Sequence, residues 1–182
     1  IIGGSFSGAS SALLLKRKHP DLRILVIEKS ERFDYRVGES TSEVSGCFLT
    51  RVLKVSHHLA CDHFQKNGLR LWFNAEGNSD PGRCTEIGPF SQSRFPTYQL
   101  DRSLLDEHLI ATARAEGCTV MRPANVKEIH LHDDRNEIVV KEGEQVHTFQ
   151  CKWLIDASGK AALLARKLGH FQPLPTHPVS SM

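Results

Sequence analysis

The sequence has little that would assign the chain to a membrane or to a nucleic acid. Its longest apolar stretches, such as residues 24–27, are far too short to cross a bilayer. No charged segment followed by an apolar one opens the chain, and no run of basic residues accompanies the formal net charge of +2. We therefore expect a cytoplasmic globular protein with no membrane span and no nucleic-acid partner.

The sequence also lacks paired cysteines and clustered metal ligands. Five cysteines lie far apart, in an odd number and without the spacing of a zinc clip or a CxxC motif: Cys47, Cys61, Cys84, Cys118 and Cys151. The ten histidines are scattered and have no partners at ligand spacing. We expect free, mostly buried thiols and no metal site.

A strand–turn–helix–strand pattern is present at the start of the chain. Ile1 and Ile2 are typical of the end of a buried strand, and residues 7–18 are predicted to form a helix that His19 and Pro20 end. Residues 23–28 carry a consecutive apolar run, which is typical of a parallel strand covered on both faces. This order predicts a βαβ unit.

The remainder of the chain alternates between helical and strand patterns. Helical periodicity predicts helices over residues 42–53, 104–116 and 161–168. Strands are expected at residues 69–73 and 120–121, and an antiparallel group is expected at residues 126–132, 137–141 and 147–152. Residues 153–156 resemble another apolar strand end, and we expect a long loop over residues 74–95 and an irregular, proline-containing tail from residue 171 on.

The glycine-rich turn between the first strand and helix has the form of a dinucleotide-binding motif. Gly3, Ser5 and Gly8 occupy the three slots of G-x-G-x-x-G, which permit a tight turn, close approach to a pyrophosphate and close helix packing. Glu28 ends the next strand, where a carboxylate receives ribose hydroxyls and repels a 2′-phosphate. The turn therefore favours FAD or NAD over NADP, with a turn that serves packing only as the alternative.

Ser5 departs from the motif because glycine is usual at the second slot. Its side chain could crowd the approach to the phosphates or donate its hydroxyl hydrogen to them. These two roles predict opposite effects of a Ser5→Gly substitution on cofactor affinity, and we expect the substitution to be tolerated.

Three further stretches, in this order, complete a recognisable set. They are R-V-G-E-S-T from Arg36, D-R-S-L-L-D from Asp101 and W-L-I-D-A-S-G from Trp153. With the opening turn, they make the chain resemble the FAD domain of flavin-dependent monooxygenases, and within that superfamily the tryptophan-halogenase-like FAD-dependent oxidoreductases. The resemblance implies FAD as the cofactor, and it covers essentially the whole chain.

The resemblance implies that the R-V-G-E-S-T stretch lies along the flavin. Arg36, Gly38, Glu39 and Ser40 would bind the cofactor there through the backbone and the Glu39 carboxylate. The alternative is a helix N-terminus with Ser40 or Thr41 as the N-cap and a capping acid at the start of the helix.

The later stretches supply the other implied cofactor contacts. Arg102 would reach FAD from the start of a helix, although it could instead be a surface arginine paired with Asp106. Val126 resembles the residue whose backbone meets the adenine. Asp156 and Gly159 resemble the second FAD motif near the ribitol, with a turn before a helix as the alternative.

Lys66 is the one candidate catalytic residue. Its K-x-G setting resembles the stretch that carries the lysine of flavin-dependent halogenases, which takes up the active halogen. The alternative is a solvated lysine at a helix C-terminus. The W-x-W-x-I-P motif of halogenases is absent, since Trp72 and Trp153 are the only tryptophans, but that motif normally lies further along than this chain runs.

Together these features predict an α/β, Rossmann-like FAD-binding domain with a parallel sheet and a small antiparallel insertion. Residues 1–182 would form an N-terminal fragment of an FAD-dependent oxidoreductase, a monooxygenase or halogenase that acts through a flavin peroxide on a small-molecule substrate. A separate flavin reductase would be a partner. The alternatives are a flavin reductase of the geranylgeranyl-reductase kind and an FAD-binding module that is inactive on its own.

Overall fold

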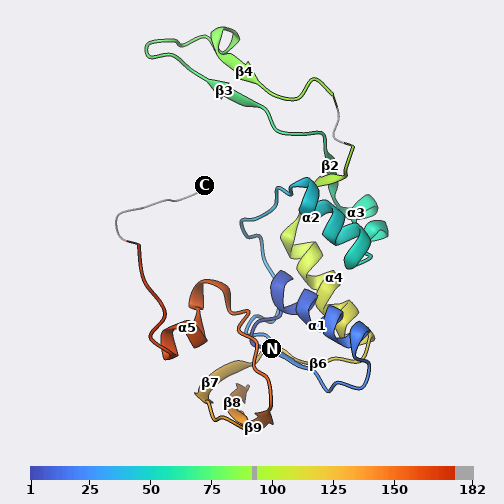
Figure 1. Ribbon diagram of the computed structural model, residues 1–182, viewed down its shortest axis with the longest axis vertical. Helices are drawn as coiled ribbons and strands as arrows, with labels where there is room; N and C mark the ends of the chain where they lie inside the picture. The colour runs from blue at the N-terminus through green and yellow to red at the C-terminus, as the bar shows by residue number, and fades with distance from the viewer. Residues whose placement is uncertain (92–93, 175–182) are drawn as a thin grey trace. The chain divides into compact units, whose positions relative to one another are not determined.

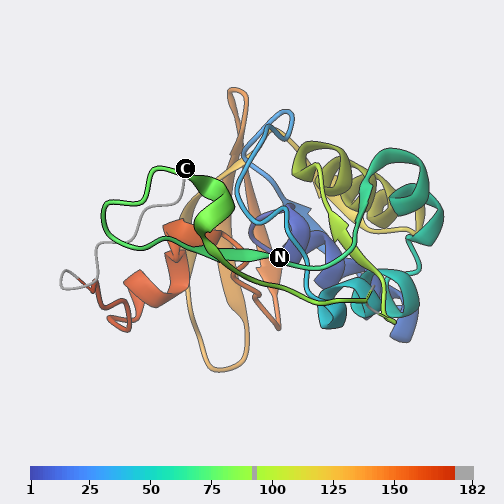
Figure 2. The same ribbon diagram turned by 90° about the horizontal axis from the view of Figure 1, so that it is seen from above.

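A computed structural model describes residues 1–91 and 94–174, and it divides the chain into two compact units. The first, which we call the turn unit, comprises Ile1–Val37 and the chain from Arg102 on. The second, the hairpin unit, comprises Gly38–Asp101. Figure 1 and Figure 2 show their elements from two directions. Of the predicted irregular tail, Pro175 and Pro178 lie outside the described residues.

The turn unit contains the predicted parallel sheet. Strand β1 (Leu25–Ile27) pairs in parallel with β6 (Thr119–Met121), and Ile2 forms parallel bridges to both Ile27 and Asp156. The end of the first strand therefore lies between two parallel neighbours, which confirms the βαβ prediction.

Two helices of this unit, α1 (Phe6–Lys18) and α4 (Arg102–Ala115), lie side by side (Figure 1). Their facing residues are small or apolar and fully buried, among them Leu13 and Leu105. The periodic apolar positions of the sequence thus predicted both helices to within about two residues at each end.

The antiparallel insertion is also present. Strands β7 (Asn125–His130), β8 (Asn136–Glu142) and β9 (Gln145–Cys151) form one sheet in this order. Its buried residues join those of the parallel sheet in one apolar cluster: Ile2, Ile27, Ala124, Ile129, Ile138 and Val140. A 3₁₀ turn (Gly159–Ala161) and the short helix α5 (Leu163–Lys167) follow.

The hairpin unit is built from short elements. It contains α2 (Glu43–Cys47), a π-helical turn (Phe48–Val52), α3 (Ser56–Asp62), a 3₁₀ turn (Pro81–Arg83) and the strands β2 (Phe64–Lys66), β3 (Leu71–Phe73), β4 (Thr85–Ile87) and β5 (Thr97–Gln99). The hairpin of β3 and β4 extends away from α2 and α3 (Figure 1). The expected loop over residues 74–95 was therefore partly wrong, because β4 lies within it. Strands of three residues are too short to show a period.

Membrane-spanning helices, metal ligands and cysteines were considered within the described residues. No helix there has the length and apolarity that a membrane crossing requires. The described ranges also contain no group of three side chains that could hold a metal ion. All five cysteines are free, but only Cys118 is buried. The expectation of mostly buried thiols was wrong, because the other four lie on short or peripheral elements that leave side chains partly exposed.

Candidate functional site

The glycine turn is packed so closely that its glycines cannot be replaced without steric conflict. A Cβ on Gly3, whose φ is +97°, would lie 2.3 Å from the carbonyl oxygen of Ala157. A Cβ on Gly8 would lie 1.8 Å from the carbonyl oxygen of Gly3. The first and third slots of the motif therefore serve a tight turn and close packing.

Glu28 is tied to this turn by its side chain. Its carboxylate is 5% exposed, and it accepts hydrogen bonds from the amides of Gly4 (2.7 Å) and Ser30 (2.8 Å). Each carboxylate oxygen keeps a second acceptor position. The carbonyl of Glu28 accepts from the amide of Ala124, two residues before Val126 on β7. The structure thus brings Glu28, the turn and Val126 into one region.

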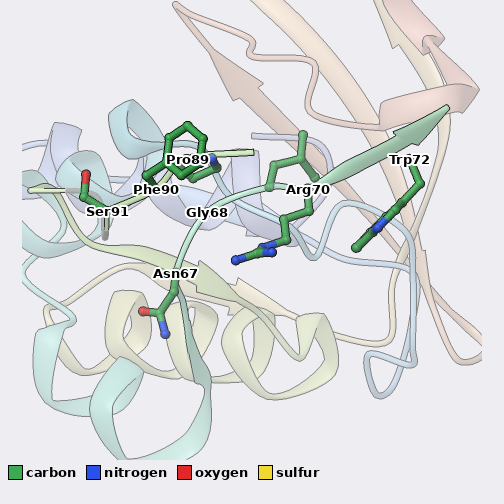
Figure 3. A pocket seen from close by; sticks show the side chains of 8 residues that line it. Asn67, Gly68, Arg70, Trp72, Pro89, Phe90 and Ser91 are labelled. Atoms are coloured by element: carbon green, nitrogen blue, oxygen red, sulfur yellow. The ribbon is translucent and has the colours of Figure 1, made fainter. Parts of the chain in front are cut away.

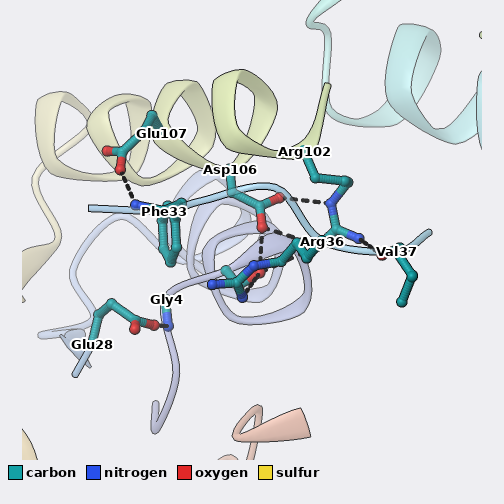
Figure 4. A network of polar contacts seen from close by, with 9 residues as sticks. Gly4, Glu28, Phe33, Arg36, Val37, Arg102, Asp106 and Glu107 are labelled. Atoms are coloured by element: carbon teal, nitrogen blue, oxygen red, sulfur yellow. Dashed lines mark hydrogen bonds and ion pairs between the residues drawn. The ribbon is translucent and has the colours of Figure 1, made fainter. Parts of the chain in front are cut away.

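The Ser5 side chain takes part in a network of contacts within the protein. It is the N-cap residue of α1, but its side chain does not cap the helix. Its hydroxyl donates to the Oδ2 atom of Asp106, and it accepts from Nη1 of Arg36 and Nη2 of Arg102, each at 3.3 Å (Figure 4). The hydroxyl hydrogen is therefore directed at a carboxylate of the protein.

Asp106 is a functional candidate that the sequence analysis named only as a surface partner. The residue is completely buried, and Arg102 binds it through Nε to Oδ1 and Nη2 to Oδ2, both at 3.0 Å. The predicted pair exists, but the description of Arg102 as a surface arginine was wrong, because its side chain is 14% exposed. The signal was available: Asp106 stands four residues before Ile110 on the apolar face of a helix.

Asp156 and Gly159 also lie beside the glycine turn. The carboxylate of Asp156 accepts from the amides of Ser158 (2.9 Å) and Leu164 (2.8 Å). Desolvation opposes ionisation of this carboxyl, but these hydrogen bonds outweigh it and lower its pKa below the usual value. Gly159 has a φ of +62°, and Ala157 faces Gly3 across the parallel bridge. The segment is thus both a turn before a helix and a neighbour of the motif.

The R-V-G-E-S-T stretch crosses the boundary between the two units. Arg36 belongs to the turn unit, where it contacts Ser5, whereas Gly38, Glu39 and Ser40 belong to the hairpin unit. There the Glu39 carboxylate accepts from the Gln99 side chain at 3.1 Å, and Ser40 bridges to β5.

The predicted cap of the following helix was wrong. Ser42, rather than Ser40 or Thr41, is the N-cap of α2, and its hydroxyl accepts from the Ser45 amide. Thr41 instead binds to β5, where it donates hydrogen bonds to Tyr98 and accepts one from it.

Lys66 lies on a strand rather than at a helix end. Helix α3 ends at Asp62, and Lys66 is the last residue of β2, which pairs with β5. Its half-buried amine donates to Oγ of Ser40 (2.6 Å) and to the carbonyl oxygen of Thr41 (2.8 Å). The alternative of a solvated helix-end lysine was therefore wrong about the position, and the K-x-G and G-E-S-T stretches meet.

A pocket of about 460 Å³ opens in the hairpin unit directly after Lys66 (Figure 3). Its lining combines apolar and aromatic side chains with polar ones and one guanidinium: Asn67, Gly68, Leu69, Arg70, Trp72, Pro89, Phe90 and Ser91. Such a lining suits a small apolar or aromatic ligand more than a highly charged one.

Comparison with known proteins agrees with the sequence resemblance. No protein-family model matches the chain. LodB of Marinomonas mediterranea, named as an FAD-dependent oxidoreductase, is 32% identical over 93% of this chain and 44% of its own length. The flavin-dependent halogenase chlA of Dictyostelium discoideum is 28% identical over 97% of this chain and 34% of its own.

The fold is shared with flavin-dependent enzymes of known structure. The halogenase PltM, crystallised with phloroglucinol and FAD, superimposes with a TM-score of 0.77 at 20% identity over 92% of this chain and 35% of its own. The fold is therefore the Rossmann-like FAD-binding fold that was predicted. The resemblance to FAD-dependent oxidoreductases and flavin-dependent halogenases is confirmed, and the chain spans less than half the length of the curated relatives it matches.

Proposed function

We propose that this chain, similar to FAD-dependent oxidoreductases and flavin-dependent halogenases over more than nine-tenths of its length, binds FAD through its glycine turn. The observation that carries the proposal is the joining of Glu28 to the turn by the 2.7 Å bond to the Gly4 amide. A ribose acceptor and a phosphate-binding helix N-terminus are thereby held together, as an adenine dinucleotide requires.

The residues of the turn unit fit such a cofactor. The backbone positions at Gly3 and Gly8 have no room for a Cβ, and Arg36 brings positive charge to the first residues of α1. Gly3, Gly8 and Arg36 would hold the pyrophosphate, Glu28 the ribose, and the backbone at Val126 the adenine. Asp156 and Gly159 would lie near the ribitol. The cofactor roles of Gly38, Glu39 and Ser40 stay predictions from the resemblance.

The reaction we propose is an oxidation with molecular oxygen, as in a monooxygenase or a halogenase. Bound FAD supplies the redox chemistry, and the protein supplies position and electrostatics. In the hairpin unit, Ser40 and Thr41 hold the Lys66 amine through hydrogen bonds at 2.6 and 2.8 Å. This amine can then hydrogen-bond an oxidised halogen or oxygen species and present it to a small-molecule substrate. A separate flavin reductase and a cytoplasmic location belong to the same proposal.

The test is a flavin titration of the purified protein. We expect visible absorption bands of bound flavin, either as purified or after addition of FAD, and no comparable affinity for NADPH, because Glu28 repels a 2′-phosphate. A protein that stays colourless with FAD and binds NADPH tightly would contradict the proposal. An Arg135→Met variant, changed at the exposed end of the β7–β8 hairpin, should bind FAD as the parent does and is the control for arginine substitutions at the turn.

A further inference from the structure

The hydroxyl of Ser5 has no capacity left for a cofactor phosphate. A serine hydroxyl has one hydrogen to donate and two lone pairs to accept with. Its hydrogen goes to Asp106, and its two acceptor positions face the guanidinium groups of Arg36 and Arg102 at 3.3 Å each. Ser5 therefore acts on the site through these three neighbours.

The charges around Ser5 do not balance. Arg102 satisfies both oxygens of the buried Asp106 carboxylate, so these two charges compensate each other. Arg36 has no carboxylate partner among the described residues, and its contacts there are the Ser5 hydroxyl and the face of the Phe33 ring at 5.2 Å. One uncompensated positive charge thus stands at the N-terminus of α1, which already favours anions.

Glycine at position 5 would change this arrangement in two ways. The buried Asp106 carboxylate would lose one of its donors, and Arg36 would lose the acceptor that holds it at the turn (Figure 4). Within the described part of the chain, the Phe33 ring would then be the one remaining contact of this exposed arginine, so it would sample more rotamers, and more of its order would have to come from the ligand.

We propose that Ser5 is a positioning residue that holds Arg36 at the turn for the pyrophosphate of the cofactor. The serine replaces the usual second glycine because it couples the uncompensated guanidinium to the Asp106–Arg102 pair. The inference rests on the proposed binding of FAD, and it reverses the expectation that Ser5→Gly is tolerated.

A double-mutant cycle tests the inference through FAD dissociation constants, measured by quenching of flavin fluorescence. We expect Ser5→Gly and Arg36→Met each to raise the dissociation constant about tenfold, the scale of one charge-assisted hydrogen bond. The double variant should bind FAD at most about twofold more weakly than Arg36→Met does, because both substitutions remove the same interaction. Ser5→Thr keeps the hydroxyl and should bind FAD as the parent does.

Several outcomes would overturn the inference. The Ser5→Gly variant could bind FAD as tightly as the parent does. Alternatively, the increases in dissociation constant caused by the two single substitutions could multiply in the double variant. If Ser5→Gly does not fold, as thermal unfolding without FAD would reveal, Arg36→Met decides. The inference then fails if this variant binds FAD no more weakly than Arg135→Met. A parent protein that binds no FAD at all refutes the proposed function instead, so the two failures are distinguishable.

Discussion

The two units of this chain differ in the burial of the side chains that are candidates for function. In the turn unit, Asp106 and Glu28 are buried carboxylates with every contact supplied by the protein, and Leu105 is fully enclosed. In the hairpin unit, large apolar side chains lie in the open: Trp72 is 59% exposed and Phe73 is 54% exposed. The candidate groups of the first unit are thus enclosed by protein, whereas the second presents an exposed apolar strand pair and a half-buried candidate catalytic amine.

This difference leads to separate predictions for the proposed cofactor site and for the proposed catalytic amine. Because the groups of the glycine turn are buried, changing them should affect stability and cofactor affinity together. Lys66 is only half-buried and is held by two hydrogen bonds on a short strand. Changing it should affect the reaction and leave the fold and the cofactor site intact.

The largest expected effect is that of Lys66→Ala on product formation. We expect a loss of at least about a hundredfold, the scale for one positioned catalytic group, while FAD binding and flavin reduction stay unchanged. Lys66→Arg should not restore activity, because a guanidinium is bulkier and far less nucleophilic. Product and hydrogen peroxide release should be measured together under oxygen.

Lys152→Ala, an exposed lysine of the turn unit, is the matched control for this substitution. Product formation by Lys66→Ala at the parent's rate would remove Lys66 from the mechanism. Oxygen-independent turnover would instead favour the reductase alternative.

Glu28→Ala should have the next largest effect, and it should be seen in two measurements. FAD affinity should fall at least about tenfold, and the free energy of unfolding should fall by about 1–3 kcal/mol because the amides of Gly4 and Ser30 lose their acceptor. Isothermal titration and urea unfolding give the two values. Glu144→Ala, whose carboxylate side chain is 97% exposed, should change neither value. Equal behaviour of the two variants would contradict the role of Glu28.

A smaller effect is expected from a pair of apolar substitutions, one in each unit. Val140→Ala removes a fully buried side chain from the cluster of the turn unit and should lower the free energy of unfolding by about 1–3 kcal/mol. Trp72→Ser removes an exposed side chain of the hairpin and should change it by less than about 0.5 kcal/mol. Urea unfolding of both variants measures these changes in the free energy of unfolding. Similar losses in Val140→Ala and Trp72→Ser would contradict the difference between the two positions.

The smallest expected effect is that of Asp156→Asn on the stability of the fold at acidic pH. Because the pKa of Asp156 is lower in the folded chain than its usual value of 3.8, its ionised form stabilises the fold above that value. This contribution is lost as the pH falls through the folded pKa. In Asp156→Asn, the free energy of unfolding should therefore fall less steeply with decreasing pH below about pH 4 than it does in the parent. Asp134→Asn, at an exposed position, should not have this effect.

The turn unit was the more predictable of the two. Helices α1 and α4 and the strands β7, β8 and β9 follow from apolar periodicity over enough residues to be distinctive. In the hairpin unit, β2, β4 and β5 escaped prediction because each has three residues and lies among loop-forming residues. The misplacement of Lys66 at a helix end has the same cause, because β2 pairs with β5, a strand that no sequence pattern predicts.

The sequence by itself determined the glycine turn, the position of Glu28 after the next strand and the order of the cofactor motifs. These can be read from residue types and from their spacing and order along the chain. Only the tertiary structure decided that the Ser5 hydroxyl binds Asp106 and that the Lys66 amine binds Ser40. The first pair is separated by 101 positions and the second by 26. Which distant partner receives a hydrogen bond depends on how the elements pack, and no local pattern contains that information.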